Sequence, residues 1–205
     1  DYLFQPSFRD VLTSKAVWAV FIAAMGVYFV LQFGGVFSPQ YYTSVLGYSP
    51  SIAGTLTIIP MIALLPARLL TGIVSDRLSV LSEVAKLRLF NSLASFIGAA
   101  FFAIVLFVRP SANDAAATAL IMIPFVLLAL TSGGFQKAAV LISREHAPFV
   151  FSVMHIFNMI SLLAATFLIP LLTPDNTFII VLIISNVFFT IFVKAEPEEW
   201  AMQKV

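Results

Sequence analysis

The sequence predicts an all-α membrane protein with six transmembrane helices. Of its 205 residues 60% are hydrophobic and only 10% are charged, whereas a soluble domain carries about 25% charged residues. No Asp, Glu, Lys, Arg or His occurs from Ala16 to Ala67, or from Ala115 to Gln136. Because one crossing needs about 20 apolar residues, the first of these stretches is long enough for two helices with a turn between them.

Proline, glycine and charged residues divide the chain into its elements. The first span is predicted over 16–37, ended by Ser38-Pro39, and the second over 51–75, with Ser51 as its N-cap. A charged loop over 76–86 follows. The later spans are predicted over 87–108, 115–141, 149–172 and 178–193. Residues 16–193 thus form the bundle, between a lead-in (1–15) and a polar tail (194–205). The sixth span would rise only about 24 Å, less than the hydrocarbon thickness of about 30 Å.

Basic residues are distributed unequally between the two sides of this topology. One side holds only Arg109. The other side holds Arg9, Lys15, Arg77, Lys86, Arg88, Arg144, Lys194 and Lys204. Since Lys and Arg in short loops favour the cytosolic side, we expect both ends of the chain to be cytosolic. Plasma membrane and vesicle membrane both stay open.

Several classes of function find no support in the sequence. The chain has no cysteine, so disulfides and thiolate metal sites are excluded. It has no H-E-x-x-H motif, no phosphate-binding G-x-x-x-x-G-K-S/T loop and no acidic pair within a span. Its two histidines lie on different segments. We therefore expect no enzyme activity, catalytic residue, metal site or cofactor. With a net charge of +1 and no basic run, we expect no nucleic-acid partner either.

The segment Gly72-Ile73-Val74-Ser75-Asp76-Arg77 resembles the G-x-x-x-D-R signature of the major facilitator superfamily, which follows the second helix of each half. Here Leu78-Ser79-Val80 replaces the usual glycine and further basic residues. Other stretches are similar to solute-carrier family 17, the organic anion and phosphate transporters that include sialin and the vesicular glutamate carriers. These stretches are Val17-Trp18-Ala19-Val20, Ser38-Pro39-Gln40-Tyr41, Val45-Leu46-Gly47-Tyr48, Ser132-Gly133-Gly134-Phe135, His146-Ala147-Pro148-Phe149 and Ala195-Glu196-Pro197-Glu198-Glu199-Trp200.

This resemblance implies half of a twelve-helix fold, built from two inverted three-helix repeats. The chain would supply helices seven to twelve, and its partner would be an N-terminal six-helix half of the same polypeptide. Gly72, Asp76 and Arg77 would latch the cytosolic side against that half. The family usually has a short segment with Glu and Trp before its last helix, but here Asn176-Thr177 runs straight into Phe178. This departure indicates a deletion or missing residues.

Spans one and four carry glycine pairs, Gly34-Gly35 and Gly133-Gly134, each close to a glutamine, Gln32 and Gln136. Interrupted helices at matching positions of two repeats are typical of transporter binding sites. Close packing of small residues between helices is the alternative. Tyr28 and Gln32 share one helix face, which forms either a helix–helix hydrogen bond or a wall facing substrate.

Ionisable side chains within spans are candidate functional groups. Arg68 and Lys137 would either bind an anion or extend their charged ends to the membrane interface. In span five Ser152, His155, Asn158 and Thr166 form one polar stripe. His155 is interpreted either as a neutral, hydrogen-bonded side chain or as a proton-coupling group facing the bundle interior.

The leading hypothesis is a secondary active transporter that moves small organic anions or phosphate through the lipid bilayer by alternating access. Coupling to H⁺ or Na⁺ stays open. One alternative is a stand-alone six-helix protein, as a channel subunit or a scaffold that does not transport. Another is a facilitator-type transporter of neutral solutes, because a fold does not determine its substrate.

Overall fold

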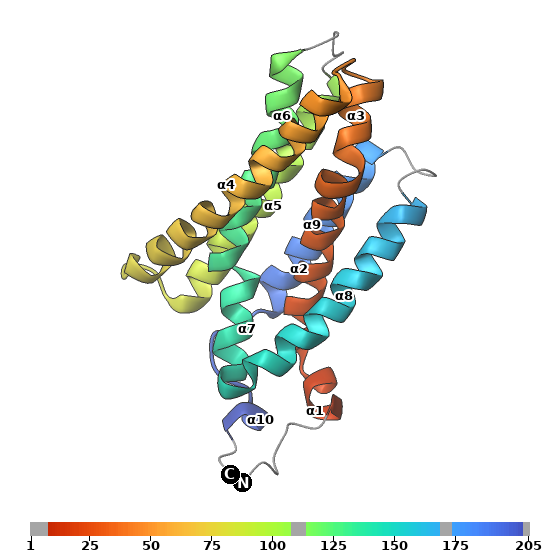
Figure 1. Ribbon diagram of the computed structural model, residues 1–205. Coiled ribbons are helices and arrows are strands. Elements are labelled where there is room, and N and C mark those ends of the chain that lie inside the picture. The colour runs from red at the N-terminus through yellow and green to blue at the C-terminus, as the bar shows by residue number, and fades with distance from the viewer. Residues whose placement is uncertain (1–7, 108–113, 169–173, 203–205) are drawn as a thin grey trace.

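The computed structural model is a bundle of helices (Figure 1). It describes residues 8–107, 114–168 and 174–202, and every regular element in these ranges is a helix. The main elements are α1 (Phe8–Thr13), α2 (Lys15–Gln32), α3 (Ser38–Ser44), α4 (Pro50–Arg77), α5 (Glu83–Phe107), α6 (Ala115–Leu127), α7 (Phe135–Ser143), α8 (Ala147–Leu168), α9 (Pro174–Phe192) and α10 (Glu199–Met202). The predicted all-α class is confirmed.

Four helical stretches in the described residues are long and apolar enough to cross a membrane: Lys15–Ser44, Pro50–Arg77, Glu83–Phe101 and Ala115–Phe167. A shorter apolar helix covers Ile179–Phe192. The stretch Ala115–Phe167 has 53 residues, about 80 Å if it were straight. It reverses direction at Arg144, where φ is 45°, so that α8 runs back toward the other end of the bundle beside α2 (Figure 1). A division into exactly six spans stays a prediction.

The first predicted span ends later than expected, because Ser38-Pro39 does not stop the helix. A π-helical turn over Phe33–Phe37 joins α2 directly to α3. Proline cannot donate a backbone hydrogen bond, and a π-helical turn shifts the hydrogen-bonding register by one residue. The Ser38 hydroxyl donates to the carbonyl of Gly34, which satisfies one carbonyl group at the irregular turn.

Other boundaries also differ from the prediction. The N-cap of α4 is Ser49, whose hydroxyl accepts from the backbone N–H of Ile52 at 3.5 Å, and not Ser51. Proline is favoured in the first helical position, so α4 begins at Pro50, before the predicted cap at Ser51. The charged loop shrinks to 78–82 because α4 and α5 extend into it. The predicted ends of spans three and five, at 108 and 172, lie outside the described residues, as does Arg109.

The sixth predicted span is longer than expected. Its helix α9 begins at Pro174 and has 19 residues, about 28 Å at 1.5 Å per residue. Pro174, Asp175 and Asn176, which lie between the fifth and sixth predicted spans, form its first turn, and the helix runs through Asn176 to Phe178 without interruption. Proline and acidic residues both favour a helix N-terminus.

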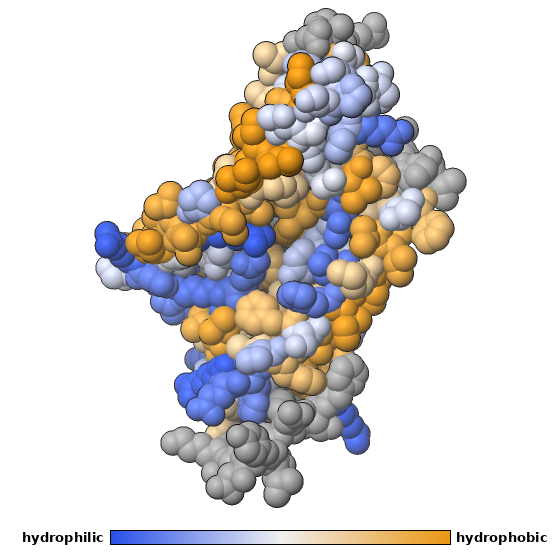
Figure 2. All heavy atoms as spheres, in the orientation of Figure 1, coloured by the Kyte–Doolittle hydropathy of each residue, from blue (hydrophilic) through white to orange (hydrophobic). Residues whose placement is uncertain are grey.

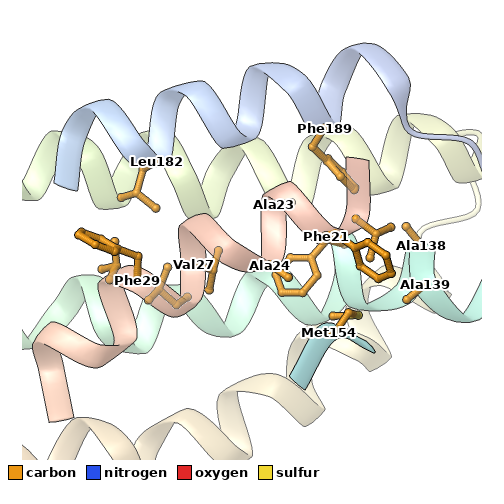
Figure 3. Packing of buried hydrophobic residues seen from close by; sticks show 14 of the residues in the cluster. Phe21, Ala23, Ala24, Val27, Phe29, Ala138, Ala139, Met154, Leu182 and Phe189 are labelled. Carbon is orange, nitrogen blue, oxygen red and sulfur yellow. The ribbon is translucent and has the colours of Figure 1, made fainter. Parts of the chain in front are cut away.

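Helix α2 forms the centre of the bundle. Phe21, Ala24 and Val27 are buried on it, and Figure 3 shows them facing residues of α7, α8 and α9. The first long helix of each half of the chain packs on helices of the other half. Helix α2 packs on α8 and α9, whereas α6 and the 3-10 segment after it pack on α4 and α5. Helices α5 and α9 pack against each other.

The two ends of the bundle carry different connections. Helices α1 and α10, the α4–α5 turn and the α7–α8 turn lie toward one end, whereas α3 and the start of α6 lie at the other (Figure 1). The tail is docked at the first end: the backbone N–H of Glu198 donates to the carbonyl of Ile142 at 3.0 Å, and Trp200 is buried. The lead-in is anchored by Trp18, whose indole N–H donates to the carbonyl of Leu12 at 2.8 Å.

Candidate functional site

A polar surface lies on the face of the bundle between α4 and α8. Figure 2 shows hydrophilic atoms in the middle of this face, with hydrophobic surface on both sides. Four helices supply the candidate residues predicted from sequence. Those residues are Tyr28 and Gln32 on α2, Arg68 on α4, Gln136 and Lys137 on α7, and His155 and Asn158 on α8. We call this set the polar face.

Arg68 is half-buried on α4, and its Nε is buried without a hydrogen-bond partner among the described residues. No Asp or Glu of the described residues forms an ion pair with it at 4.0 Å or less. Tyr28 of α2 lies close enough for an electrostatic interaction with the guanidinium. The guanidinium therefore retains capacity to bind an anion, and its five N–H donors match carboxylate and phosphate oxygens.

Tyr28 and Gln32 connect α2 to its neighbours. The ring of Tyr28 meets Phe135 of α7 edge-on, with centroids 6.3 Å apart, an arrangement that aromatic pairs prefer. The side-chain amide of Gln32 donates to Oδ1 of Asn158 on α8 at 3.2 Å. The amide pair is a helix–helix hydrogen bond, which is one of the two alternatives for this face. Both side chains are half-exposed, and a wall that faces substrate stays a prediction.

His155 lies three residues before Asn158 and is exposed on α8. Its Nδ1 is 3.0 Å from the carbonyl oxygen of Phe151. Because a carbonyl oxygen only accepts, Nδ1 carries the proton of the neutral ring, and Nε2 is available as an acceptor. Because the His155 side chain is exposed, it lies on the surface of the polar face and is not enclosed by the bundle. Ser152 and Thr166 of the same stripe are also exposed, and each hydroxyl bonds to a carbonyl of its own helix.

Lys137 is paired with carboxylates. Its ammonium lies 2.7 Å from Asp76 and 3.3 Å from Glu83, and it also donates to the hydroxyl of Ser75 at 3.3 Å. Glu83 pairs in addition with Lys86. We call these five residues the Lys137 cluster. It connects α7 to the end of α4 and the start of α5, so Asp76 latches two parts of this chain, whereas the sequence resemblance implied a latch to another half.

Half-buried Gln136 adjoins Lys137 on α7, and Arg77 is exposed at the end of α4. Gly72 has no atom within 4 Å of the place where a Cβ would lie, so packing does not require a glycine there. Within the described residues, no three His, Asp or Glu side chains are grouped as a metal site would need.

Both glycine pairs lie at irregular segments of their helices. Gly34 and Gly35 fall in the π-helical turn, and Gly133 ends the 3-10 segment Leu128–Gly133. Pro124 removes one backbone donor before that segment, and the hydroxyls of Thr131 and Ser132 donate to the carbonyls of Leu128 and Ala129 at 2.6 and 2.8 Å. Such local bonds compete with the helical pattern.

Three of these glycines are packed tightly. A Cβ on Gly34 would lie 2.6 Å from the ring of Phe125, and one on Gly133 would lie 2.9 Å from Phe90. A Cβ on Gly134 would lie 2.8 Å from the side chain of Asn91. Gly35, by contrast, has open space around it. Within each of these helices, irregular geometry and close packing thus occur together.

The sequence interpretation missed two polar contacts between helices. Asn91 of α5 donates to Oδ1 of Asn186 of α9 at 2.9 Å, and Nδ2 of Asn186 donates to Ser92 at 3.2 Å. Both asparagines are 1% exposed. The signal was present, because an amide within an apolar helix needs a partner. The second is Ser132, whose hydroxyl also donates to the carbonyl of Arg68 at 3.1 Å and so attaches the irregular segment to α4.

Comparison with models of protein families and with curated proteins finds no match for this sequence. The likeness to major facilitator transporters therefore rests on the motifs in the sequence. The arguments for function rest on the polar face.

Proposed function

We propose that this protein is a secondary active transporter that moves small organic anions or phosphate across a membrane by alternating access. The observation that carries the proposal is the half-buried Arg68, which has no carboxylate partner among the described residues and lies near Tyr28. An ionised group among apolar helices is costly unless an opposite charge compensates it. A bound anionic substrate would supply that charge, with hydrogen bonds from Tyr28, Gln32 and Asn158.

The proposed architecture has six spans that form one half of a twelve-helix transporter. The exchanged packing of α2 with α8 and α9, and of α6 with α4 and α5, supports two inverted three-helix repeats. The irregular segments at the two glycine pairs support matching roles for the first helix of each repeat. In this arrangement residues 76–86 and both ends of the chain are cytosolic, in agreement with the distribution of basic residues.

The exposure of α4 supports a second half. Of its 28 residues only Ala53, Pro60, Leu64, Thr71 and Ser75 are buried. Helix α8 leaves its polar stripe exposed. Polar side chains at membrane depth face other helices or a water-filled cavity. An N-terminal six-helix half placed against α4 and α8 would convert the polar face into the wall of such a cavity.

The test is uptake by the intact protein reconstituted in lipid vesicles. Labelled phosphate and small mono- and dicarboxylates are compared with a neutral sugar and an N-acetylated amino-acid amide, which carries no charge. We expect uptake of at least one anion, with a loss of about tenfold or more in Arg68→Gln, because a hydrogen bond to a charged group contributes about 1.5–3 kcal/mol.

The matched control is Arg88→Gln, which removes an exposed arginine of α5 and should leave uptake unchanged. Uptake of neutral solutes alone, or an unchanged rate in Arg68→Gln, would overturn the proposal. Passive, non-saturating ion currents would favour the channel alternative.

A further inference from the structure

The described residues also form a recess whose lining includes none of the residues of the polar face. It is an apolar groove of about 350 Å³ between α8 and α9, with α2 as its floor. Residues from each of the three helices line it, among them Met25, Gly26, Ser161, Ala164, Ile184 and Ser185. Figure 3 shows α9 lying along α2. The volume falls at the lower end of the range of about 300–1,000 Å³ for ligand pockets.

Small residues on all three helices leave room for the groove. Gly26 of α2 lies directly against the side chain of Ser185, and a Cβ at this glycine would overlap that hydroxyl. On the other side, Ser161 of α8 donates to the carbonyl of Met25 at 3.3 Å. Helices α9 and α8 thus each approach α2 closely through a serine. Bulkier side chains line the space between them.

The chemistry of the lining favours an apolar ligand. The Ser185 hydroxyl donates to the carbonyl of Leu182 at 3.1 Å, and Ser161 donates to Met25. Both hydroxyl donors of the lining are therefore engaged, and its other side chains are hydrocarbon or thioether. An apolar cavity of this kind favours apolar occupants over water. A ligand here is held by contact of hydrocarbon with hydrocarbon.

The groove is continuous with the outer apolar surface of α8 and α9. At its rim Ile180 is 54% exposed and Ile184 62% exposed, and on α8 the neighbouring Leu163 and Phe167 are 60% and 68% exposed. In a membrane this surface faces lipid, so the groove opens directly toward acyl chains. We propose that it is a binding site for one acyl chain of a bilayer phospholipid. The proposal rests on the membrane location of the bundle and is independent of which solute is transported.

An occupying chain would contact the same α2–α8 junction that holds the polar face together. Ser161 lies three residues after Asn158 on α8, and Asn158 accepts the hydrogen bond from Gln32. The site thus lies beside the polar face, and a lipid tail in it would brace α8 against α2.

The test is photo-crosslinking of the purified protein in vesicles of phosphatidylcholine that carries a diazirine on one acyl chain. Adducts are mapped by mass spectrometry. We expect adducts on the α2 segment 22–29, whose Gly26 and Phe29 are otherwise buried, in addition to adducts on exposed side chains such as Phe167. Ala164→Phe places a ring in the groove and should abolish the α2 adducts while those at Phe167 persist.

Leu163→Phe is the matched control, because residue 163 is exposed and is not among those lining the groove; it should leave the α2 adducts in place. If Ala164→Phe does not fold, Ile184→Trp at the rim replaces it. Adducts confined to exposed side chains, or α2 adducts that survive both groove variants, would overturn the proposal. Crosslinks between two copies of the chain through this groove would also overturn it. Transport is measured separately, so loss of the adducts leaves the proposed transport activity standing.

Discussion

The ammonium of Lys137 lies 2.7 Å from the carboxylate of Asp76 and thereby joins α7 to the end of α4. The lysine side chain is 18% exposed, whereas that of Asp76 is 71% exposed. Glu83 lies 3.3 Å from the same ammonium. A partly buried cation thus has two carboxylates at its open side, and its charge is compensated without a substrate.

The first prediction concerns this ion pair. Asp76→Asn should lower the free energy of unfolding by about 0.5–1 kcal/mol, because Lys137 keeps Glu83 as a partner. Lys137→Met should cost more than Asp76→Asn, because it removes the cation that both carboxylates share. Denaturant unfolding of the single and double variants in detergent gives a coupling energy, which we expect to be about 1 kcal/mol.

Arg77→Gln is the control for this cycle, since Arg77 is the exposed neighbour of Asp76 and its loss should change stability by less than about 0.5 kcal/mol. Strictly additive effects of the two cluster variants would show that the contact contributes nothing.

The second prediction compares two adjacent glycines. Gly34→Ala should destabilise the protein by about 1–3 kcal/mol, because the new methyl group would lie 2.6 Å from the Phe125 ring and overpacking carries costs of this size. Gly35→Ala meets no atom within 4 Å and should be neutral or stabilising, because alanine is the better helix former. Thermal unfolding measured by circular dichroism separates them, and equal shifts for both variants would contradict the steric explanation.

The glycine pairs also show how much of the fold could be predicted from the sequence. Charge-free stretches and breaker residues predicted the helices, and the pairs marked where two of them become irregular. The sequence did not predict that the first helix continues through Pro39, because the π-helical turn depends on Ser38 bonding to Gly34. Nor did it predict the tight contact of Gly26 with Ser185, since a single glycine in a helix carries no sign of its distant neighbour.

For the same reason, the contacts among the candidate residues could be predicted only in part. Residue type singled out Tyr28, Gln32, Arg68 and Asn158, because polar groups are unusual in apolar helices. Their pairing depends on which helices pack together, over separations of up to 126 residues for Gln32 and Asn158. Lys137 was a candidate for anion binding, but its pairing with Asp76 and Glu83 could be recognised only once α7 lay against the α4–α5 turn.

The third prediction concerns the buried amide pair between α5 and α9. Asn186→Leu removes the partner of both Asn91 and Ser92 and should lower the free energy of unfolding by about 1–2 kcal/mol. The double variant Asn91→Leu, Asn186→Leu should be less destabilised than the sum of the two single variants, because no unpaired amide is left. Denaturant unfolding in detergent measures all three.

Thr166→Val provides the reference for the amide pair, because that exposed hydroxyl donates to Leu162 of its own helix and to no other group among the described residues, so its removal should have little effect. A double variant that loses at least the sum of the single effects would show that the amides do not act as a pair.

The last prediction concerns His155 and rests on the proposed transport of anions. If His155 is the proton-coupling group, uptake depends on pH through this side chain, which lies on the polar face that holds Arg68. His155→Gln cannot change charge and should flatten the profile of uptake rate against pH.

His146→Gln is the matched control for this prediction. The centroid of that ring lies 6.0 Å from that of Trp200 at the α7–α8 turn, away from the polar face, and its loss should keep the slope of the wild-type profile. An unaltered profile in His155→Gln would exclude this histidine as the titrating group, while the uptake rate of Arg68→Gln would still report on anion binding independently.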